Sequence, residues 1–162
     1  MLFENLPIDP ETLPAVETLE FRSLEREYLK VSNIGSLLFF GLLIIVFLTL
    51  SLTGVWKFQV WVQLVIGAIL LLLFGYSIWY NYRNFRIQGY ALREHDISYQ
   101  DGVFFFTLTT IPFNRVQHCE VKQGPVERWF GLNTLQVFTA GGQTSDLVIP
   151  GLAPENAQQL KT

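Results

Sequence analysis

Few side chains in this sequence have the chemistry needed to bind a metal ion, and their spacing is poor for it. His118, Cys119 and Glu120 are consecutive, while the second histidine, His95, lies in a predicted turn. The segment around His118 predicts a β-strand, in which neighbouring side chains point to opposite faces. His118 and Cys119 are therefore badly placed to share a metal ion. We expect no metal site and a buried, apolar role for the single cysteine.

The residue types of a hydrolytic triad are also present, as Ser145, Asp146 and His118, but nothing in their spacing brings them together. The sequence has no glycine-rich phosphate loop, no nucleophile elbow and no carboxylate pair at a useful spacing. We therefore expect no catalytic residue, no cofactor and no enzyme activity.

The most distinctive polar segment is Gln123–Gly131, which follows Lys122. Arg128 offers a planar donor fork that suits carboxylate or phosphate groups, and Trp129 adds apolar area with a donor at its edge. One interpretation is a protruding loop that uses Lys122, Arg128 and Trp129 to bind a partner or lipid headgroups. The other is a fixed structural corner in which Phe130 plugs the core of a domain.

Two long apolar runs must position this segment. Neither Val31–Trp56 nor Phe58–Tyr82 contains a charged residue, and Lys57 stands between them. Each run exceeds the roughly 20 residues that a helix needs to cross a hydrocarbon core of about 30 Å. The sequence therefore predicts a transmembrane helical hairpin over 31–82, preceded by an N-terminal cytoplasmic segment, 1–30, and followed by a small domain, 83–162.

The bases around the helical hairpin indicate its orientation. Six bases flank its two ends and one, Lys57, lies in the connection; the six are Arg22, Arg26, Lys30, Arg83, Arg86 and Arg93. Lys and Arg are enriched in cytoplasmic flanks, so we expect a two-span protein of the cell membrane with both termini in the cytoplasm. The net charge is −3 and the C-terminal domain has no excess of bases, which argues against nucleic acid as a partner.

After Tyr82 the pattern of apolar residues becomes alternating, as in half-buried strands. Strands are expected over Arg86–Arg93, Asp96–Gln100, Val103–Ile111, Arg115–Gln123, Thr134–Ala140 and Asp146–Ile149, followed by a helix over Ala153–Leu160. Such a sheet must curl or fold over to protect its edges, as a small barrel or sandwich does. The expected core is Tyr90, Leu92, Ile97, Phe104, Phe106, Val121, Leu135, Val137 and Ile149.

Ordered motifs in this domain resemble those of a known family. They read I-P-x-x-R-V-Q at Ile111–Gln117, Q-G-P-x-x-R-x-x-G-L at Gln123–Leu132, T-A-G at Thr139–Gly141 and I-P-G at Ile149–Gly151. This order, after a two-span hairpin, resembles the bacterial pleckstrin-homology-like (PH-like) domain membrane proteins of the YdbS/YdbT type. The resemblance implies a PH-like β-barrel of two nearly orthogonal sheets capped by a C-terminal helix.

Two departures from the family pattern bear on partners. We count six strands where a full PH-like barrel has seven, and the cap of about ten residues would be only about 15 Å long. Both favour dependence on a partner: another membrane protein, a second copy, or a larger PH-like family member, besides the lipid bilayer itself.

Two classes of function remain open from the sequence. The first is a non-catalytic adaptor that presents a cytoplasmic PH-like module to a protein, peptide or lipid headgroup within a membrane assembly. The alternative is a membrane-embedded enzyme or transporter accessory subunit. The apolar runs contain no Asp, Glu, Lys, Arg or His, which such machines usually place within the membrane, so the adaptor is favoured.

Overall fold

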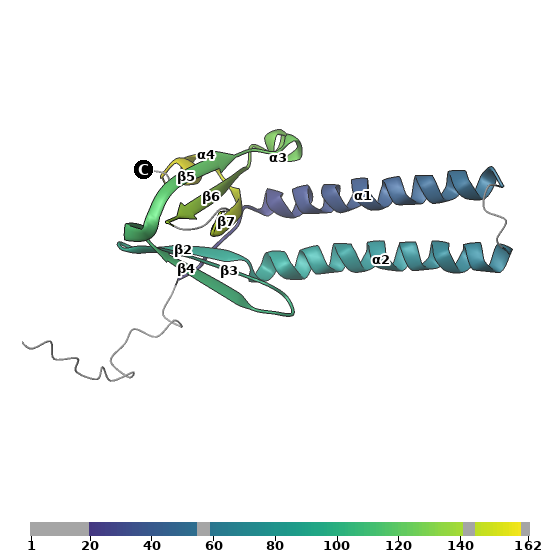
Figure 1. The fold of residues 1–162 in the computed structure, drawn as a ribbon, viewed down its shortest axis with the longest axis horizontal. Coiled ribbons are helices and arrows are strands. Elements are labelled where there is room, and N and C mark those ends of the chain that lie inside the picture. Colours follow the sequence, from purple (N-terminus) through teal and green to yellow (C-terminus); the bar gives the residue numbers. More distant parts are fainter. Residues whose placement is uncertain (1–19, 55–58, 141–144, 160–162) are drawn as a thin grey trace, which may run out of the picture.

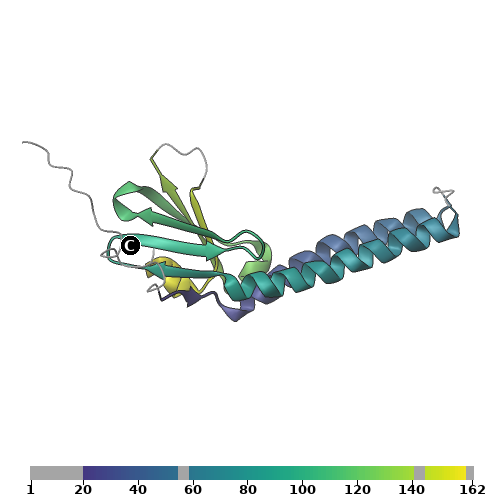
Figure 2. The same cartoon turned by 90° about the horizontal axis from the view of Figure 1, so that it is seen from below.

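The computed structural model describes residues 20–54, 59–140 and 145–159 (Figure 1). Two long helices, α1 (Arg26–Leu52) and α2 (Val60–Ile87), lie side by side, with a small β-rich domain at one end of the pair. The same arrangement is visible after a quarter turn in Figure 2. The N-terminal segment 1–19, the connection residues Trp56 and Lys57, and the predicted Gly141–Gly142 turn lie outside the described residues.

Both helices have the length and the surface of membrane spans. They contain 27 and 28 residues, so each is about 40 Å long and longer than the roughly 30 Å hydrocarbon core. No residue of either helix is buried within the chain, although both are strongly apolar. Helices that are apolar all round are stable where lipid covers them. The prediction of two candidate spans is thus confirmed.

Polar side chains join the two helices near the domain. Asn81 Nδ2 donates to Ser36 Oγ at 2.9 Å and to Asn33 Oδ1 at 3.2 Å, and Ser77 Oγ donates to Ser36 Oγ at 2.8 Å. Toward the other end, Ser51 Oγ donates to Gln63 Oε1 at 2.7 Å. Hydrogen bonds of this kind fix how membrane helices pair.

The β-domain consists of two antiparallel sheets. The first contains β1 (Arg22–Ser23), β2 (Gly89–Leu92), β3 (Asp96–Asp101) and β4 (Thr107–Pro112), in that order. The second contains β5 (Val116–Lys122), β6 (Asn133–Thr139) and β7 (Leu147–Leu152). The short helices are η3 (Phe113–Arg115), α3 (Pro125–Trp129) and α4 (Pro154–Gln159).

The predicted antiparallel strands and the short C-terminal helix are confirmed; the strands of the described residues form two separate sheets and no closed barrel. The chain leaves the first sheet at Pro112, makes the single turn of η3, and only then enters β5. Because proline has no backbone N–H to donate, this junction does not continue the ladder. One apolar cluster unites both sheets, and α4 covers it with Ala157, which is fully buried.

The alternation of apolar and polar residues along the strands correctly predicted most of the central core residues. Five of the expected residues are buried: Tyr90, Ile97, Leu135, Val137 and Ile149. Val121 is partly buried and packs against them. The core also contains residues that were not anticipated, among them Leu24, Tyr99, Ile111, Leu147 and Leu152.

Three expected core residues are exposed, and each lies at or beyond the end of a strand. Leu92 is 51% exposed because β2 ends there, at the edge of the domain. Phe104 and Phe106 are each 64% exposed, since β4 begins only at Thr107 and both lie in the loop before it. The predicted strand over Val103–Ile111 was therefore too long at its start.

The segments that enter the domain also differ from expectation. Helix α2 continues to Ile87, so the strand expected from Arg86 begins only at Gly89. A further strand, β1, was not predicted from the sequence. It pairs with β2 and forms the edge of the first sheet. Its two residues are too few to show an alternating pattern.

Hydrogen bonds attach both helices to the domain. The backbone N–H of Glu25, just before α1, donates to the carbonyl oxygen of Gly151 at 3.1 Å. Gln100 Nε2 donates to the carbonyl of Ile87 at 3.0 Å, and the N–H of Gly102 donates to Asn84 Oδ1 at 3.2 Å. The domain therefore contacts both helices through hydrogen bonds, in addition to its covalent connection to them.

Candidate binding surface

The segment singled out in the sequence forms a corner between β5 and β6. Its centre is Glu127, the third residue of α3. Glu127 Oε2 accepts a hydrogen bond from the Gly124 N–H at 2.6 Å, and Oε1 accepts one from the Thr134 hydroxyl at 2.7 Å. One carboxylate thus ties the start of α3 to the start of β6, and charge-assisted hydrogen bonds of this length are among the strong ones.

The exit from α3 is equally well defined. The Leu132 N–H donates to the Glu127 carbonyl at 2.9 Å, and Gln123 Nε2 donates to the Leu132 carbonyl at 2.9 Å. Gly131 has a φ of +65°, a conformation that glycine adopts without steric cost. Phe130 is only half-buried and does not plug the core as expected; Leu132 is the buried residue here.

The two interpretations of this segment describe different parts of it. The backbone and Glu127 form a fixed corner, whereas Arg128 and Trp129 project outward from it. The Trp129 side chain is 81% exposed, which is unusual for so large an apolar group. The corner thus presents an exposed indole and an exposed guanidinium on a hydrogen-bonded frame.

Lys122 stands at the same end of the second sheet. It is the last residue of β5, and it pairs with Thr134, which in turn contacts Glu127. Lys122 Nζ lies 3.2 Å from Glu120 Oε2, and both side chains are about half exposed, so this ion pair partly offsets the lysine charge. The three predicted binding residues therefore share one corner, with Arg128 and Trp129 as its most protruding pair.

The side chains considered for metal binding point to opposite faces of β5, as expected for neighbouring residues of a strand. His118 Nε2 lies 3.7 Å from Glu120 Oε1, and the imidazole stacks on the Phe138 ring at 4.4 Å between centroids. Cys119 points to the opposite face and packs against the core. Within the described ranges, no three His, Cys, Asp or Glu side chains cluster in a way that could hold a metal ion.

The residues considered for catalysis have structural contacts. Asp146 Oδ2 accepts hydrogen bonds from the Thr139 hydroxyl at 2.6 Å and the Thr139 N–H at 2.9 Å, and these hydrogen bonds lower the pKa of the Asp146 carboxyl. Neither hydrogen bond joins Asp146, which lies just before β7, to His118, which lies on β5.

Sequence reasoning missed the polar contacts between the helices. Its one usable signal was spacing: Asn33 and Ser36 lie three residues apart on α1, and Ser77 and Asn81 lie four apart on α2. These intervals place each pair on one helix face. Because both faces can belong to any partner helix, only the structure shows that they meet each other.

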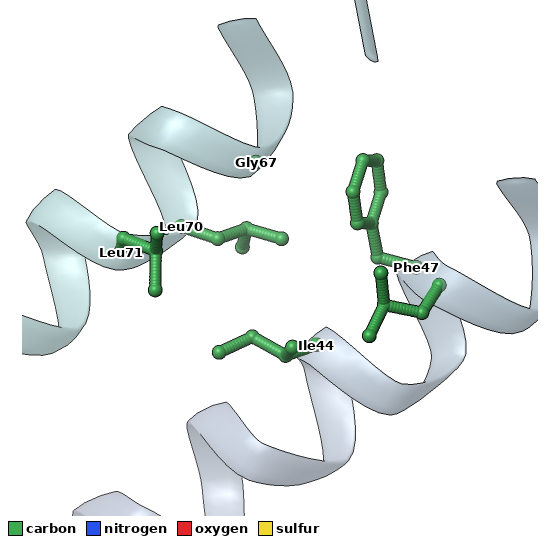
Figure 3. A pocket seen from close by; sticks show the side chains of 6 residues that line it. Ile44, Phe47, Gly67, Leu70 and Leu71 are labelled. Atoms are coloured by element: carbon green, nitrogen blue, oxygen red, sulfur yellow. The ribbon is translucent and has the colours of Figure 1, made fainter. Parts of the chain in front are cut away.

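An apolar hollow lies between the two helices, in the half of the pair away from the domain (Figure 3). Its volume is about 140 Å³, and it is lined by Ile44, Phe47, Leu48, Gly67, Leu70 and Leu71. Gly67 faces the Phe47 ring, as a close approach of the second span to the first would require, whereas Gly75 has open space where a side chain would be. With only hydrocarbon around it, the hollow offers no polar group for catalysis or transport.

Comparison with known proteins agrees with the motifs of the domain. The family model described as "Bacterial PH domain" matches residues 30–162. The chain is also similar to the UPF0699 transmembrane protein YdbS of Bacillus subtilis strain 168, with 31% identity over 120 residues, which is 74% of each chain. No solved structure matches. With two apolar helices leading into this domain, the chain belongs to the bacterial PH domain family as a transmembrane protein of the YdbS type.

Proposed function

We propose that this protein is a non-catalytic adaptor whose bacterial PH domain captures a partner at the cytoplasmic face of the cell membrane. The surface that binds is the corner of Lys122, Arg128 and Trp129. The observation that carries the proposal is the Trp129 indole, 81% exposed beside an exposed arginine on a hydrogen-bonded frame. Trp and Arg are the residue types most enriched among the energetic centres of protein interfaces.

The chemistry of the corner favours an acidic segment of another membrane protein as the partner. Arg128 supplies a fork of donors for a carboxylate, and Trp129 supplies an apolar surface next to it. A second copy of this chain or a larger member of the family is included in this class. Because the helices hold the domain at the membrane, its effective concentration near other membrane proteins is high, and a weak contact suffices.

The cytoplasmic location rests on charge. Both helices meet the domain at the same end of the helical hairpin (Figure 1), which supports placing both termini on one side. Six flanking bases against one in the connection favour the cytoplasmic side. A thiol introduced by Thr53→Cys should react with an impermeant reagent in intact cells and one introduced by Leu92→Cys should not; the reverse pattern would overturn this orientation.

Capture of the partner from mild detergent tests the binding surface. The double variant Arg128→Ala with Trp129→Ala should lose the proteins that co-purify with the natural chain, while its thermal midpoint stays nearly unchanged. The double variant Phe113→Ala with Arg115→Ala is a matched control, because it removes an aromatic and an arginine from η3, also at the surface.

Two results would count against the proposal. If the control loses the partner as completely as the test variant, capture does not depend on this corner. If the test variant lowers the thermal midpoint strongly, Arg128 and Trp129 stabilise the fold and the binding surface lies elsewhere. The alternative function, an accessory subunit of a membrane enzyme or transporter, would be favoured if capture persists and the partner's own activity changes.

A further inference from the structure

The loop between β3 and β4 exposes three consecutive phenylalanines. The side chains of Phe104, Phe105 and Phe106 are 64%, 87% and 64% exposed. Such a run of apolar side chains on the surface of a domain is unfavourable in water and marks a contact with an apolar partner. No charged residue occurs from Gly102 to Ile111, so the loop has no charge of its own to keep it in water.

The loop lies against the membrane helix that it accompanies. The Phe104 ring stacks on Tyr80 of α2, with 6.3 Å between centroids and 18° between the planes. Figure 1 shows the β3–β4 end reaching alongside the last turns of α2. The rise of α2 from Val60 to Tyr80 is about 30 Å, and the hydrocarbon core of a bilayer has about the same thickness. With the start of α2 at one boundary of the core, Tyr80 lies at the other. Phe104 is therefore level with the boundary between acyl chains and headgroups.

The neighbours of Tyr80 on α2 have the composition of that boundary. Tyr76, Trp79 and Tyr80 form a cluster of aromatic rings with centroids 5.7 and 6.4 Å apart. Arg83 and Arg86 follow within the next two turns and are exposed, where they can reach lipid phosphates. Aromatic belts followed by bases are typical of the inner membrane interface.

The loop is fixed in this position by its backbone. Gly102 has a φ of +103°, and a Cβ there would lie 1.9 Å from the Phe105 carbonyl oxygen. The loop therefore folds tightly over Gly102, in a form that a residue with a side chain cannot take. The Gly102 N–H donates to Asn84 Oδ1 on α2, which holds the loop beside the helix.

We propose that Phe104, Phe105 and Phe106 insert into the membrane leaflet next to the domain, so that the loop is a third membrane contact besides the two helices. The ligand is the lipid itself, at the depth where headgroups meet acyl chains. The lipid-facing surface of α2 continues directly onto the loop through the Tyr80–Phe104 stack. This inference does not depend on which side of the membrane holds the domain.

Depth-dependent quenching in reconstituted vesicles tests the insertion. In a Cys119→Ala background, Phe105→Cys carries an environment-sensitive fluorophore, and Leu92→Cys carries the same fluorophore as the matched control. Leu92 is also an exposed apolar residue of the first sheet, but it lies at the end of the sheet away from the helices. The vesicles contain phosphatidylcholine and phosphatidylglycerol, with and without a lipid that carries a quencher near its headgroup.

The quencher-bearing lipid should reduce the emission of the label at position 105 several-fold more than that at position 92, and aqueous iodide should do the opposite. If iodide quenches both positions equally, the loop lies in water and the proposal is wrong. If neither quencher reaches position 105, another protein surface covers it, which also overturns the proposal. Phe105→Cys replaces a side chain that is 87% exposed, and the Cys119→Ala change, which lies against the core, is common to both labelled proteins, so the comparison between the two positions is unaffected by it.

Discussion

The α3 corner and the β3–β4 loop both expose large aromatic side chains at the end of the domain that faces the helices, one on each side of the helical hairpin (Figure 1). The corner is held by a carboxylate and presents Trp129 next to the charge of Arg128. The loop is held by the backbone of Gly102 and presents three phenylalanines without a charge.

This difference separates two kinds of exposed aromatic surface. An indole next to a cation can contact an apolar group and a carboxylate at the same time, and a protein surface presents both. Three phenyl rings with no polar group can be satisfied only by an apolar environment. This contrast is why we propose protein recognition at the corner and lipid contact at the loop, although both expose aromatic side chains.

The largest expected effect comes from the core that both regions share. Leu135 is fully buried in β6, directly opposite Val121 of β5. We expect Leu135→Ala to reduce the free energy of unfolding of the domain by about 2–5 kcal/mol, because buried leucines truncated to alanine leave a cavity. Thermal unfolding in detergent measures the change, and a cost near zero would show that corner and loop do not depend on one common core.

The two glycines of these regions offer a sharper comparison. Gly102→Ala should cost about 3 kcal/mol, since the new Cβ meets the Phe105 backbone at an already unfavourable φ. Gly131→Ala should cost only about 1 kcal/mol, because its φ of +65° is left-handed but nothing lies within 4 Å of the new Cβ.

The two variants should also separate in their effects on function. Gly102→Ala should displace the phenylalanines and leave partner capture intact, while Gly131→Ala should act on the corner alone. Unfolding experiments and the two binding assays on both variants check this. Equal costs at the two positions would mean that the loop relaxes around the new side chain.

The smallest expected effect lies at the other end of β6, where neither surface takes part. The folded pKa of Asp146 lies below its ordinary value of 3.8 because Thr139 donates to the carboxylate. The charged form is therefore favoured by folding: this contribution to stability is present above pH 3.8 and is lost as the pH falls through the folded pKa.

Thr139→Val should remove the hydroxyl donor and raise the pKa of Asp146 toward its ordinary value. Carboxyl titration followed by NMR measures this shift, and an unchanged pKa would show that the backbone N–H of Thr139 alone is responsible. The quenching of the loop and the capture by the corner should both stay as in the natural chain, so this variant also serves as a control for the comparison.

The sequence predicted those parts of the fold that leave long or regular patterns. Charge-free runs revealed both helices, and alternation identified buried residues such as Leu135 and Ile149. The loop was misjudged because Phe104 and Phe106 alternate like strand residues, and nothing local shows that β4 starts after them. The strand β1 has two residues, and only its pairing with β2 reveals it.

The sequence predicted which residues form the candidate surface, but it did not predict the hydrogen bonds that hold them in place. Residue types alone pointed to Arg128 and Trp129, because a guanidinium offers a donor fork for carboxylate or phosphate groups and a Trp side chain is rarely fully buried. The role of Glu127 was not anticipated, since its partners Gly124 and Thr134 lie on either side of the helix and only folding brings both within reach of one carboxylate. The Gly124–Glu127 contact spans three residues and has the spacing of a capping box, whereas the contact of Glu127 with Thr134 in the next strand leaves no pattern along the chain.

The fastening of the domain to both helices has a mechanical consequence. Glu25 is hydrogen-bonded to Gly151, Ile87 to Gln100 and Asn84 to Gly102, so we expect the helices and the sheets to tilt together. When the bilayer thins or thickens, long spans respond by changing their tilt. With these contacts intact, a change in helix tilt should also move the α3 corner, and we expect the distance of Trp129 from the membrane surface to depend on the thickness of the bilayer.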